Sequence, residues 1–228
     1  MALLMKLRNI GKIIMKIVNL NLKRKEIIEI SKKYIVKDGW NEDLFESISK
    51  NSKFNIKEIL ILFPEGYLSL LKFYLKELDA HMVLNAKNIN LIRMKTHIRI
   101  REIILLKLKN NQDEKNVIKR TYFTLLLPHH SKLGLKSLYN TVDQIWFIAG
   151  DKSTDFNFYS KRFILATIYS SVILYWINNQ DFKKTTKFFD KQLRKVSKIT
   201  QTKNKVKNIF NLLPQTVNFI KKLAPTKQ

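Results

Sequence analysis

The sequence predicts an all-α protein, and two observations carry this prediction. Glycine and proline occur only five and four times in 228 residues, so turns are few and far apart. Between them, apolar residues recur every three to four positions, which is the spacing of an amphipathic helix. Breaks are expected at Gly39, Pro64, Gly66, Pro128, Gly134, Gly150 and Pro214.

The expected helices follow from these breaks. After the break at Pro64, one face of a long helix carries Tyr67, Leu71, Tyr74, Leu78 and Met82. The other helices are expected at about 24–36, 41–50, 55–62, 89–109, 113–126, 133–149, 155–178, 181–200 and 203–223.

Residues 1–23 are predicted to form a separate basic, amphipathic segment. One face of this helix carries Leu3, Leu7, Ile10, Ile14 and Ile17, and basic residues lie on another face. A basic segment without acids is typical of a mitochondrial presequence, although this one lacks serine. A helix that docks on the domain or on a membrane fits the pattern equally well.

Basic residues are concentrated at the two ends of the chain, whose net charge is +25. Residues 1–25 carry seven Lys and Arg and no acid, and residues 181–228 carry thirteen basic and two acidic residues. AT-rich coding explains part of the excess but not its uneven distribution. Basic ends bind anionic lipid or nucleic acid, and charge does not distinguish the two.

Residues 163–177, FILATIYSSVILYWI, raise the question of a membrane span. The stretch has 15 residues and includes Tyr169, Ser170 and Ser171. A spanning helix needs about 20 predominantly apolar residues. We therefore predict a buried core helix, in a protein that touches a membrane and does not cross it.

The sequence carries little that suits catalysis. Cysteine is absent, which excludes disulfides, thiolate metal sites and cysteine nucleophiles. The motifs G-x-G-x-x-G, G-x-x-x-x-G-K-[ST], G-x-S-x-G and H-E-x-x-H are absent as well. We expect a protein that is not an enzyme and that needs no metal or cofactor.

Structural roles account for the histidines and carboxylates that stand out. Glu77 and His81 lie four residues apart, one more than a Glu-x-x-His iron motif requires, so a surface pair is expected. Asp151 follows Gly150, an expected helix C-terminal cap. Asp155 falls in the first turn of the next helix, where a negative charge suits the helix dipole.

The helices at about 24–36, 41–50 and 55–62 have the lengths and short connections of a helix-turn-helix head. A DNA-reading third helix needs basic and amide side chains on its outer face. In this third helix only Lys57 is basic, Glu58 would repel phosphate, and the last four residues are apolar. The composition favours a packing role for the head over DNA binding.

Four motifs resemble those of a known family, namely DGW (38–40), LFPEG (62–66), IRIRE (98–102) and TVDQIWFIAGDKSTDFNFYSKR (141–162). Residues 24–200 thereby resemble the coenzyme Q biosynthesis protein nine family, lipid-binding accessory proteins with the fold of TetR-type regulators. The resemblance implies a TetR-like helical fold with a helix-turn-helix head, a lipid-binding body and a C-terminal amphipathic helix.

The resemblance also implies a function. Such proteins bind aromatic isoprenoid lipids among their later helices and deliver them to the di-iron demethoxyubiquinone hydroxylase. We therefore expect an accessory protein of ubiquinone biosynthesis that carries a bound isoprenoid quinone intermediate. A TetR-like DNA-binding transcriptional regulator is the alternative. We expect a homodimer that binds membrane lipid and no nucleic acid. It would lie on the matrix side of the mitochondrial inner membrane, or on the cytoplasmic side of a bacterial inner membrane.

The resemblance further implies a hydroxylase-contacting surface at residues 155–162. Its expected contact residues are Asp155, Phe158, Tyr159 and Arg162. The family usually has Trp-Tyr where this chain has Phe158-Tyr159, which removes an indole hydrogen bond and keeps the apolar contact. Large aromatic side chains commonly anchor partner interfaces, and packing in the core is the alternative for both.

Residues 201–228 are predicted to form a membrane-binding tail. One stripe of its helix carries Val206, Ile209, Phe210, Leu213, Val217, Ile220 and Leu223. Flanking lysines contribute on the order of 1 kcal/mol each at an anionic surface, which favours reversible attachment. Pro214 should kink or restart the helix. Packing of this stripe on the domain or on a second subunit is the alternative.

Overall fold

The computed structural model describes the backbone of residues 2–153 and 156–200. Within these ranges helices are the only regular secondary structure, which confirms the predicted all-α class. The chain falls into two compact units, Met1–Lys76 and Glu77–Gln228. Asp155 and the predicted membrane tail at 201–228 lie outside the described residues.

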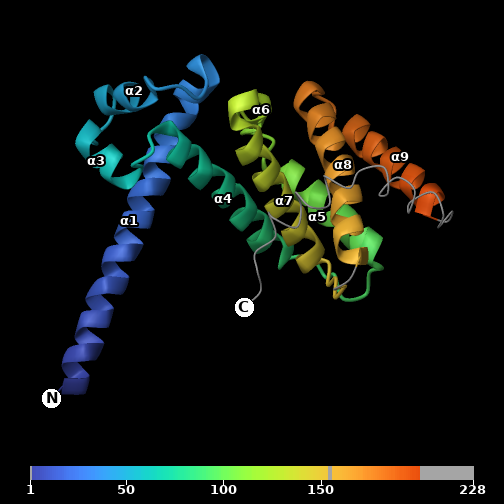
Figure 1. The fold of residues 1–228 in the computed structure, drawn as a ribbon, viewed down its shortest axis with the longest axis horizontal. Helices are drawn as coiled ribbons and strands as arrows, with labels where there is room; N and C mark the ends of the chain where they lie inside the picture. The colour runs from blue at the N-terminus through green and yellow to red at the C-terminus, as the bar shows by residue number, and fades with distance from the viewer. Residues whose placement is uncertain (1, 154–155, 201–228) are drawn as a thin grey trace. The chain divides into compact units, whose positions relative to one another are not determined.

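The first unit contains α1 (Ala2–Asp38), α2 (Leu44–Lys50), α3 (Ile56–Leu62) and the start of α4 (Tyr67–Ala86). Helix α1 runs without a break through position 23, where we predicted a segment boundary (Figure 1). No glycine or proline stands between Gly11 and Gly39 to interrupt it. Gly39 ends the helix at φ +82°, and its N–H donates to the Ile35 carbonyl at 3.0 Å.

The short helices α2 and α3 pack on α1 through fully buried side chains. Ile35, Ile48 and Ile59 are at most 1% exposed. Asn55 caps α3 because its side chain accepts a hydrogen bond from the Glu58 N–H at 2.8 Å. These three helices form the head that the sequence predicts.

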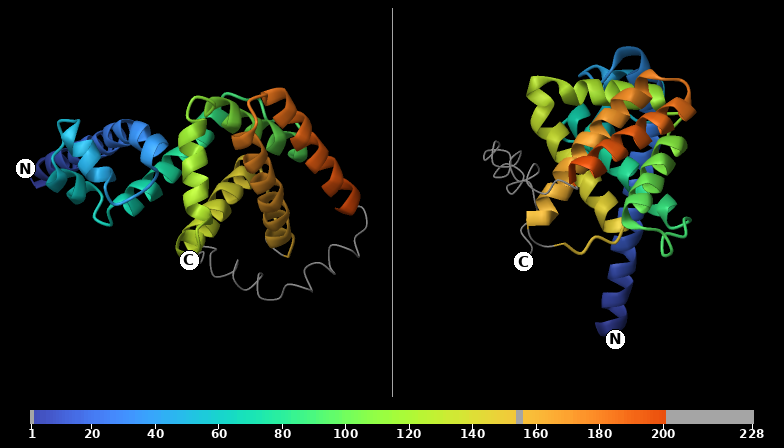
Figure 2. Two further views of the ribbon diagram at one scale, coloured as in Figure 1. Left: turned by 90° about the horizontal axis from the view of Figure 1, so that it is seen from above. Right: turned by 90° about the vertical axis from the view of Figure 1, so that its right-hand side faces the viewer.

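Among its described residues, the second unit contains the rest of α4 and five further α-helices. They are α5 (Thr96–Asn110), α6 (Lys115–Leu126), α7 (Ser131–Ile148), α8 (Phe156–Asn178) and α9 (Phe182–Thr200), with a short 3₁₀ helix, η1 (Pro128–His130), before α7. Helix α8 lies between α7 and α9 (Figures 1 and 2).

The apolar stretch at 163–177 is a buried helix, as predicted. Tyr169 and Val172 are fully buried, and Trp176 is 1% exposed. No helix among the described residues is long and apolar enough to span a membrane.

Helix α5 begins at Thr96, seven residues later than the sequence predicts. The intervening residues 87–95 form turns. The Arg99 guanidinium holds this loop by donating to the carbonyls of Met94 and Ile92 at 2.8 and 3.2 Å. Apolar periodicity could not predict this late start, because it says nothing of hydrogen bonds from Arg99, one turn into α5, to the carbonyls of the preceding loop.

Candidate functional site

The start of α8 is built on the cap that ends α7. Gly150 has φ +82°, its N–H donates to the Phe147 carbonyl, and the Asp151 N–H donates to the Trp146 carbonyl, both at 3.0 Å. This confirms the predicted capping role of Gly150. The same turn directs the Asp151 side chain toward the first turns of α8.

Arg162 on α8 joins these elements. Its side chain is buried, and its Nε donates to Asp143 Oδ1 at 2.6 Å. One terminal nitrogen donates to Asp151 Oδ2 at 3.3 Å and to the Phe158 carbonyl at 3.2 Å. The guanidinium carbon stands 3.3 Å from the centre of the Phe158 ring, a cation–π contact. Arg162 therefore fixes the position of Phe158.

Asp151 is the central acceptor of this cluster, and its side chain is only 4% exposed. It accepts hydrogen bonds from Lys161 Nζ at 2.7 Å and from Ser153 Oγ at 2.6 Å. Burial alone would raise the pKa of Asp151, but the hydrogen bonds from Lys161, Ser153 and Arg162 outweigh burial and hold that pKa below its ordinary value. These contacts confirm a structural role for this carboxylate.

Phe158 and Tyr159 lie in the first turn of α8, close to where the sequence analysis puts them. Both are half-buried, and their rings meet edge to face with centroids 5.1 Å apart. Because both side chains are half-buried, the pair is neither fully buried in the core nor fully exposed to solvent. Arg162, which was also predicted as a contact residue, lies behind Phe158 and is 5% exposed, so any effect on a partner would act through that ring.

A cavity of about 520 Å³ opens among α5, α7, α8 and α9. Its apolar lining includes Ile100, Trp146, Ile164, Leu165, Ile168 and Leu193. Its polar lining consists of His97, Lys161 and Arg194. The sequence did not identify these residues, because they come from four helices that only the fold brings together.

Side-chain contacts hold the helices around this larger cavity. Arg101 on α5 binds both carboxylate oxygens of Asp190 on α9, at 2.6 and 3.1 Å. Trp146 on α7 donates its indole N–H to the Lys161 carbonyl at 3.2 Å. Arg101 lies in the IRIRE motif, and its pairing with Asp190 gives that motif a structural explanation.

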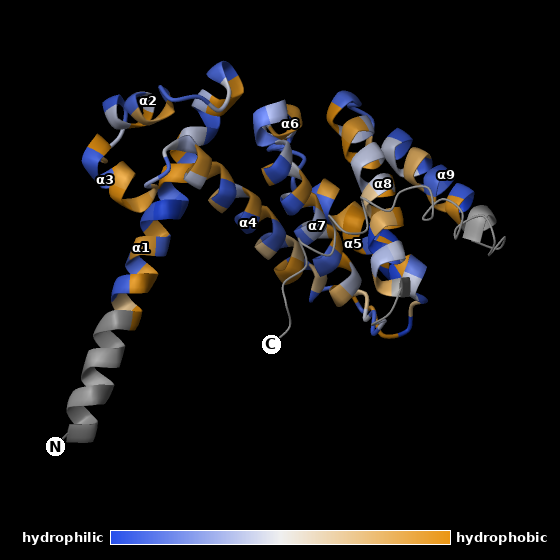
Figure 3. Cartoon of the chain, viewed as in Figure 1, coloured by the Kyte–Doolittle hydropathy of each residue, from blue (hydrophilic) through white to orange (hydrophobic). Residues whose placement is uncertain are grey.

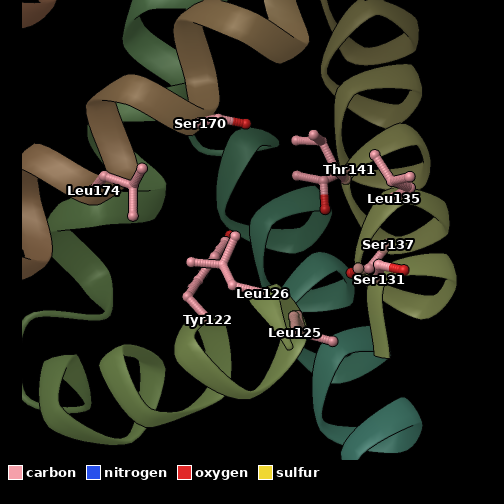
Figure 4. A pocket seen from close by; sticks show the side chains of 11 residues that line it. Tyr122, Leu125, Leu126, Ser131, Leu135, Ser137, Thr141, Ser170 and Leu174 are labelled. Carbon is pink, nitrogen blue, oxygen red and sulfur yellow. The ribbon is translucent and has the colours of Figure 1, made fainter. Parts of the chain in front are cut away.

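A smaller cavity of about 270 Å³ lies among α6, α7 and α8 (Figure 4). Tyr122, Leu125 and Leu126 reach it from α6, Leu135 and Thr141 from α7, and Ser170 and Leu174 from α8. Helices α6 and α7 approach closely beside it, because a Cβ at Gly134 would stand only 2.8 Å from the Leu125 carbonyl oxygen. This close crossing explains a glycine inside a helix.

A buried polar network lies behind the smaller cavity. Lys107 donates to Asp79 at 2.6 Å, and the Thr141 hydroxyl lies 2.9 and 3.0 Å from the two Asp79 oxygens. The Tyr122 and Tyr169 hydroxyls are 3.4 Å apart. Burial raises the pKa of both phenols. No sequence motif links these residues.

Glu77 and His81 form the predicted surface contact, at 4.0 Å. Among the residues that the structure describes, no group of three His, Asp or Glu side chains is placed to hold a metal ion.

The third helix of the head has an apolar surface. Ile56, Leu60 and Ile61 are 41%, 43% and 77% exposed, and hydrophobic positions on α3 are visible in Figure 3. Asn55 is engaged as the helix cap, and Glu58 pairs with Lys23 at 2.6 Å. The groups that read DNA are thus scarce on this helix.

The architecture defines a TetR-like helical protein. It is similar to the crystal structure of a TetR transcriptional regulator from Nitrosomonas europaea, with a TM-score of 0.64 and 16% identity over 77% of this chain and 98% of that chain. At this identity the likeness establishes the fold.

The COQ9 family model matches residues 131–200, which confirms the predicted resemblance for this segment of the chain. Two similar relatives are the mitochondrial ubiquinone biosynthesis protein COQ9 of Bos taurus and that of Homo sapiens, each 35% identical over 98 residues. These matches cover 42% of this chain and 31% of each relative, so the chain matches about a third of their length. The Schizosaccharomyces pombe protein is 26% identical over 64% of this chain and 58% of its own length.

Proposed function

We propose that the chain is a lipid-binding accessory protein of ubiquinone biosynthesis that presents an isoprenoid quinone intermediate to the demethoxyubiquinone hydroxylase and performs no chemistry of its own. The observation that carries this proposal is the larger cavity. Most of its lining residues, from Trp146 to Val196, fall within the COQ9-like segment. The relatives' names supply the pathway.

The larger cavity suits a prenyl lipid in size and chemistry. Small-molecule pockets usually measure roughly 300–1,000 Å³ and are lined mainly by apolar side chains with a few polar groups. Burying a prenyl tail gains about 25 cal/mol per Å² of apolar surface. Lys161 and Arg194 supply the polar groups that would meet a head group or nearby phosphate.

Lipid extraction and mass spectrometry of the purified full-length chain test this proposal. We expect a prenylated aromatic lipid in the wild type and strong depletion in Ile164→Trp, because the indole fills the cavity. Leu84→Trp is the control, since Leu84 is 56% exposed and does not line the cavity. A wild-type protein that carries no prenyl lipid would refute the proposal.

The hydroxylase surface is proposed to centre on Phe158 and Tyr159. The double variant Phe158→Ala/Tyr159→Ala should weaken hydroxylase binding at least tenfold, because aromatic anchors dominate interface energies. Lipid content should stay unchanged, because neither residue lines the larger cavity. Pull-down titration with purified hydroxylase measures the first quantity. An equal loss of hydroxylase binding and of lipid content would show that the pair only packs in the core. Phe123→Ala is the control, because Phe123 lies on α6 and is 46% exposed.

We further propose that residues 201–228 attach the protein to an anionic membrane, on the matrix side of the mitochondrial inner membrane. The basic, amphipathic sequence of the tail supports attachment. The mitochondrial names of the relatives support the compartment.

The alternative is a TetR-like DNA-binding regulator, which the fold of the bacterial neighbour favours. The apolar surface of α3 opposes it. Gel shifts over a range of salt concentrations separate the two, because nonspecific binding weakens steeply with salt. Sequence-specific binding that survives physiological salt would favour the regulator.

A further inference from the structure

The smaller cavity differs in construction from the larger one. Its lining contains leucines, serines, a glycine, a threonine and a tyrosine, and none of these carries a charge. Behind the lining, Asp79 and Lys107 pair with each other, so their charges cancel. A charged ligand would lose its hydration here without gaining a counter-charge, and a neutral one would not.

The exposed end and the buried end of this cavity differ in their side chains. Leu126, Leu135 and Leu174, at its open side, are 64%, 47% and 40% exposed. Thr141, in contrast, is 5% exposed and lies against the buried Asp79. The Tyr122 hydroxyl lies on the same inner side, next to the fully buried Tyr169. The cavity therefore carries three leucines at its mouth beside Ser131, which is also exposed, and the hydroxyl groups of Thr141 and Tyr122 at its inner end.

Both inner hydroxyls keep hydrogen-bonding capacity for a ligand. Thr141 uses its single proton toward Asp79, so its oxygen can still accept a hydrogen bond. The Tyr122 and Tyr169 hydroxyls share one hydrogen bond, which leaves Tyr122 able either to donate or to accept another. A ligand group that enters this end must itself donate or accept.

We infer that the smaller cavity is a second binding site, which takes an uncharged ring compound bearing a hydroxyl or carbonyl group, inserted head first with its apolar substituent toward the leucine mouth. A cavity of about 150 Å³ is enough to hold benzene, so about 270 Å³ holds a substituted ring. This inference is independent of the proposed role in ubiquinone biosynthesis, because it involves a different cavity.

The test uses 4-butylphenol as the probe, with butylbenzene and 4-butylbenzoate as analogues, in ligand-observed NMR titrations of the full chain. A purely apolar cavity would bind butylbenzene more tightly than the phenol, because the hydroxyl would be desolvated without compensation. We expect the reverse, with 4-butylphenol binding about three- to tenfold more tightly than butylbenzene and 4-butylbenzoate not binding.

Tyr122→Phe should abolish the preference for the phenol and leave butylbenzene affinity unchanged, because only the hydroxyl is removed. Tyr175→Phe, a tyrosine of α8 that does not line this cavity, should keep the preference. A preference that survives Tyr122→Phe, or a wild type that binds neither neutral probe, would overturn the inference.

Two further variants assign the site to one cavity. Ser170→Phe, which fills the smaller cavity, should abolish 4-butylphenol binding, and Ile164→Trp, which fills the larger one, should not. The opposite pattern would overturn the inference. If the wild type carries no prenyl lipid but binds 4-butylphenol, only the proposed function fails.

Discussion

Arg162 joins the turn after α7 to the first turns of α8. Its guanidinium accounts for three polar contacts and one ring contact, while the residue itself is buried. A lysine at this position could not reach Asp143 and Asp151 while also stacking on Phe158, because its charge is a single point on a flexible stem.

Arg162→Met should therefore destabilise the protein by about 3 kcal/mol, because Asp143 and Asp151 lose a buried partner. Urea unfolding followed by circular dichroism measures the free energy of unfolding. Arg93→Met is the matched control, since Arg93 is exposed, and should change stability by less than about 0.5 kcal/mol. A similar small effect for both variants would contradict the role assigned to Arg162.

Asp151 makes stability depend on pH. Its pKa is lower in the folded protein than in the unfolded chain, so its stabilising contribution is complete above the unfolded value of about 4 and is lost as the pH falls through the folded pKa. The wild type should exceed Asp151→Asn in stability at pH 7, and this difference should shrink toward pH 3. Urea titrations at the two pH values measure it, and a difference that grows in acid would contradict the assignment.

For single residues, the sequence predicts the roles that depend on neighbours close in the chain. Gly150 and the Glu77–His81 pair depend on neighbours within a few positions, and the prediction for each is confirmed. The contact of Asp79 with Lys107 and Thr141 spans 28 and 62 positions. No local pattern reports such a contact, because it depends on how three helices meet.

Apolar periodicity predicts that a helix is present. Where the helix ends depends on which groups satisfy the backbone N–H and C=O groups at its termini. The predicted ranges of α6, α8 and α9 lie close to the observed ones. The predicted start of α5 was wrong, because Arg99 stabilises the preceding loop in a non-helical conformation. Helix α1 continues through residue 23, where the charge pattern changes, because a change of charge pattern does not stop a helix.

The crossing of α6 and α7 gives a prediction opposite in sign to helix propensity. Replacing a glycine inside a helix by alanine normally stabilises it by about 0.5–1 kcal/mol. At Gly134 the new Cβ would stand 2.8 Å from a backbone oxygen, so Gly134→Ala should cost about 1–3 kcal/mol instead. Thermal and urea unfolding measure the effect, and Asn140→Ala, at an exposed position of α7, is the control. Stabilisation by Gly134→Ala would show that the helices can separate freely.

The whole molecule combines a predictable fold with cavities that the sequence could not place. The motifs around 141–162 resemble a family with an internal cavity, and the described residues surround cavities of about 520 and 270 Å³. Their lining residues come from separate helices and look like ordinary core positions in sequence. What distinguishes them is the space that remains where these helices meet, and the fold alone reveals that space.

Deleting residues 203–228 should reduce flotation with vesicles of phosphatidylcholine and cardiolipin, because the tail supplies both lysines and apolar side chains. Raising salt from 0.05 to about 0.5 M should weaken flotation of the full chain, since screening shortens the range of surface charge. Replacing the tail lysines by glutamine isolates the electrostatic share. Unchanged flotation of the deleted protein would refute the tail as the anchor.

The pairing of carboxylates inside the protein has a practical consequence for its handling. The chain has 18 acidic residues against 43 basic ones, and Asp79 and Asp151 are enclosed in internal ion pairs. Each such pair withdraws at least as much positive as negative charge, but the basic residues outnumber the acidic ones so far that a large excess of cations remains. Crude preparations should therefore carry fragments of cellular polyanions, visible as excess absorbance at 260 nm and removable by a high-salt wash. Such contamination would reflect counterion release, and a chemist who finds it has not found a cognate ligand.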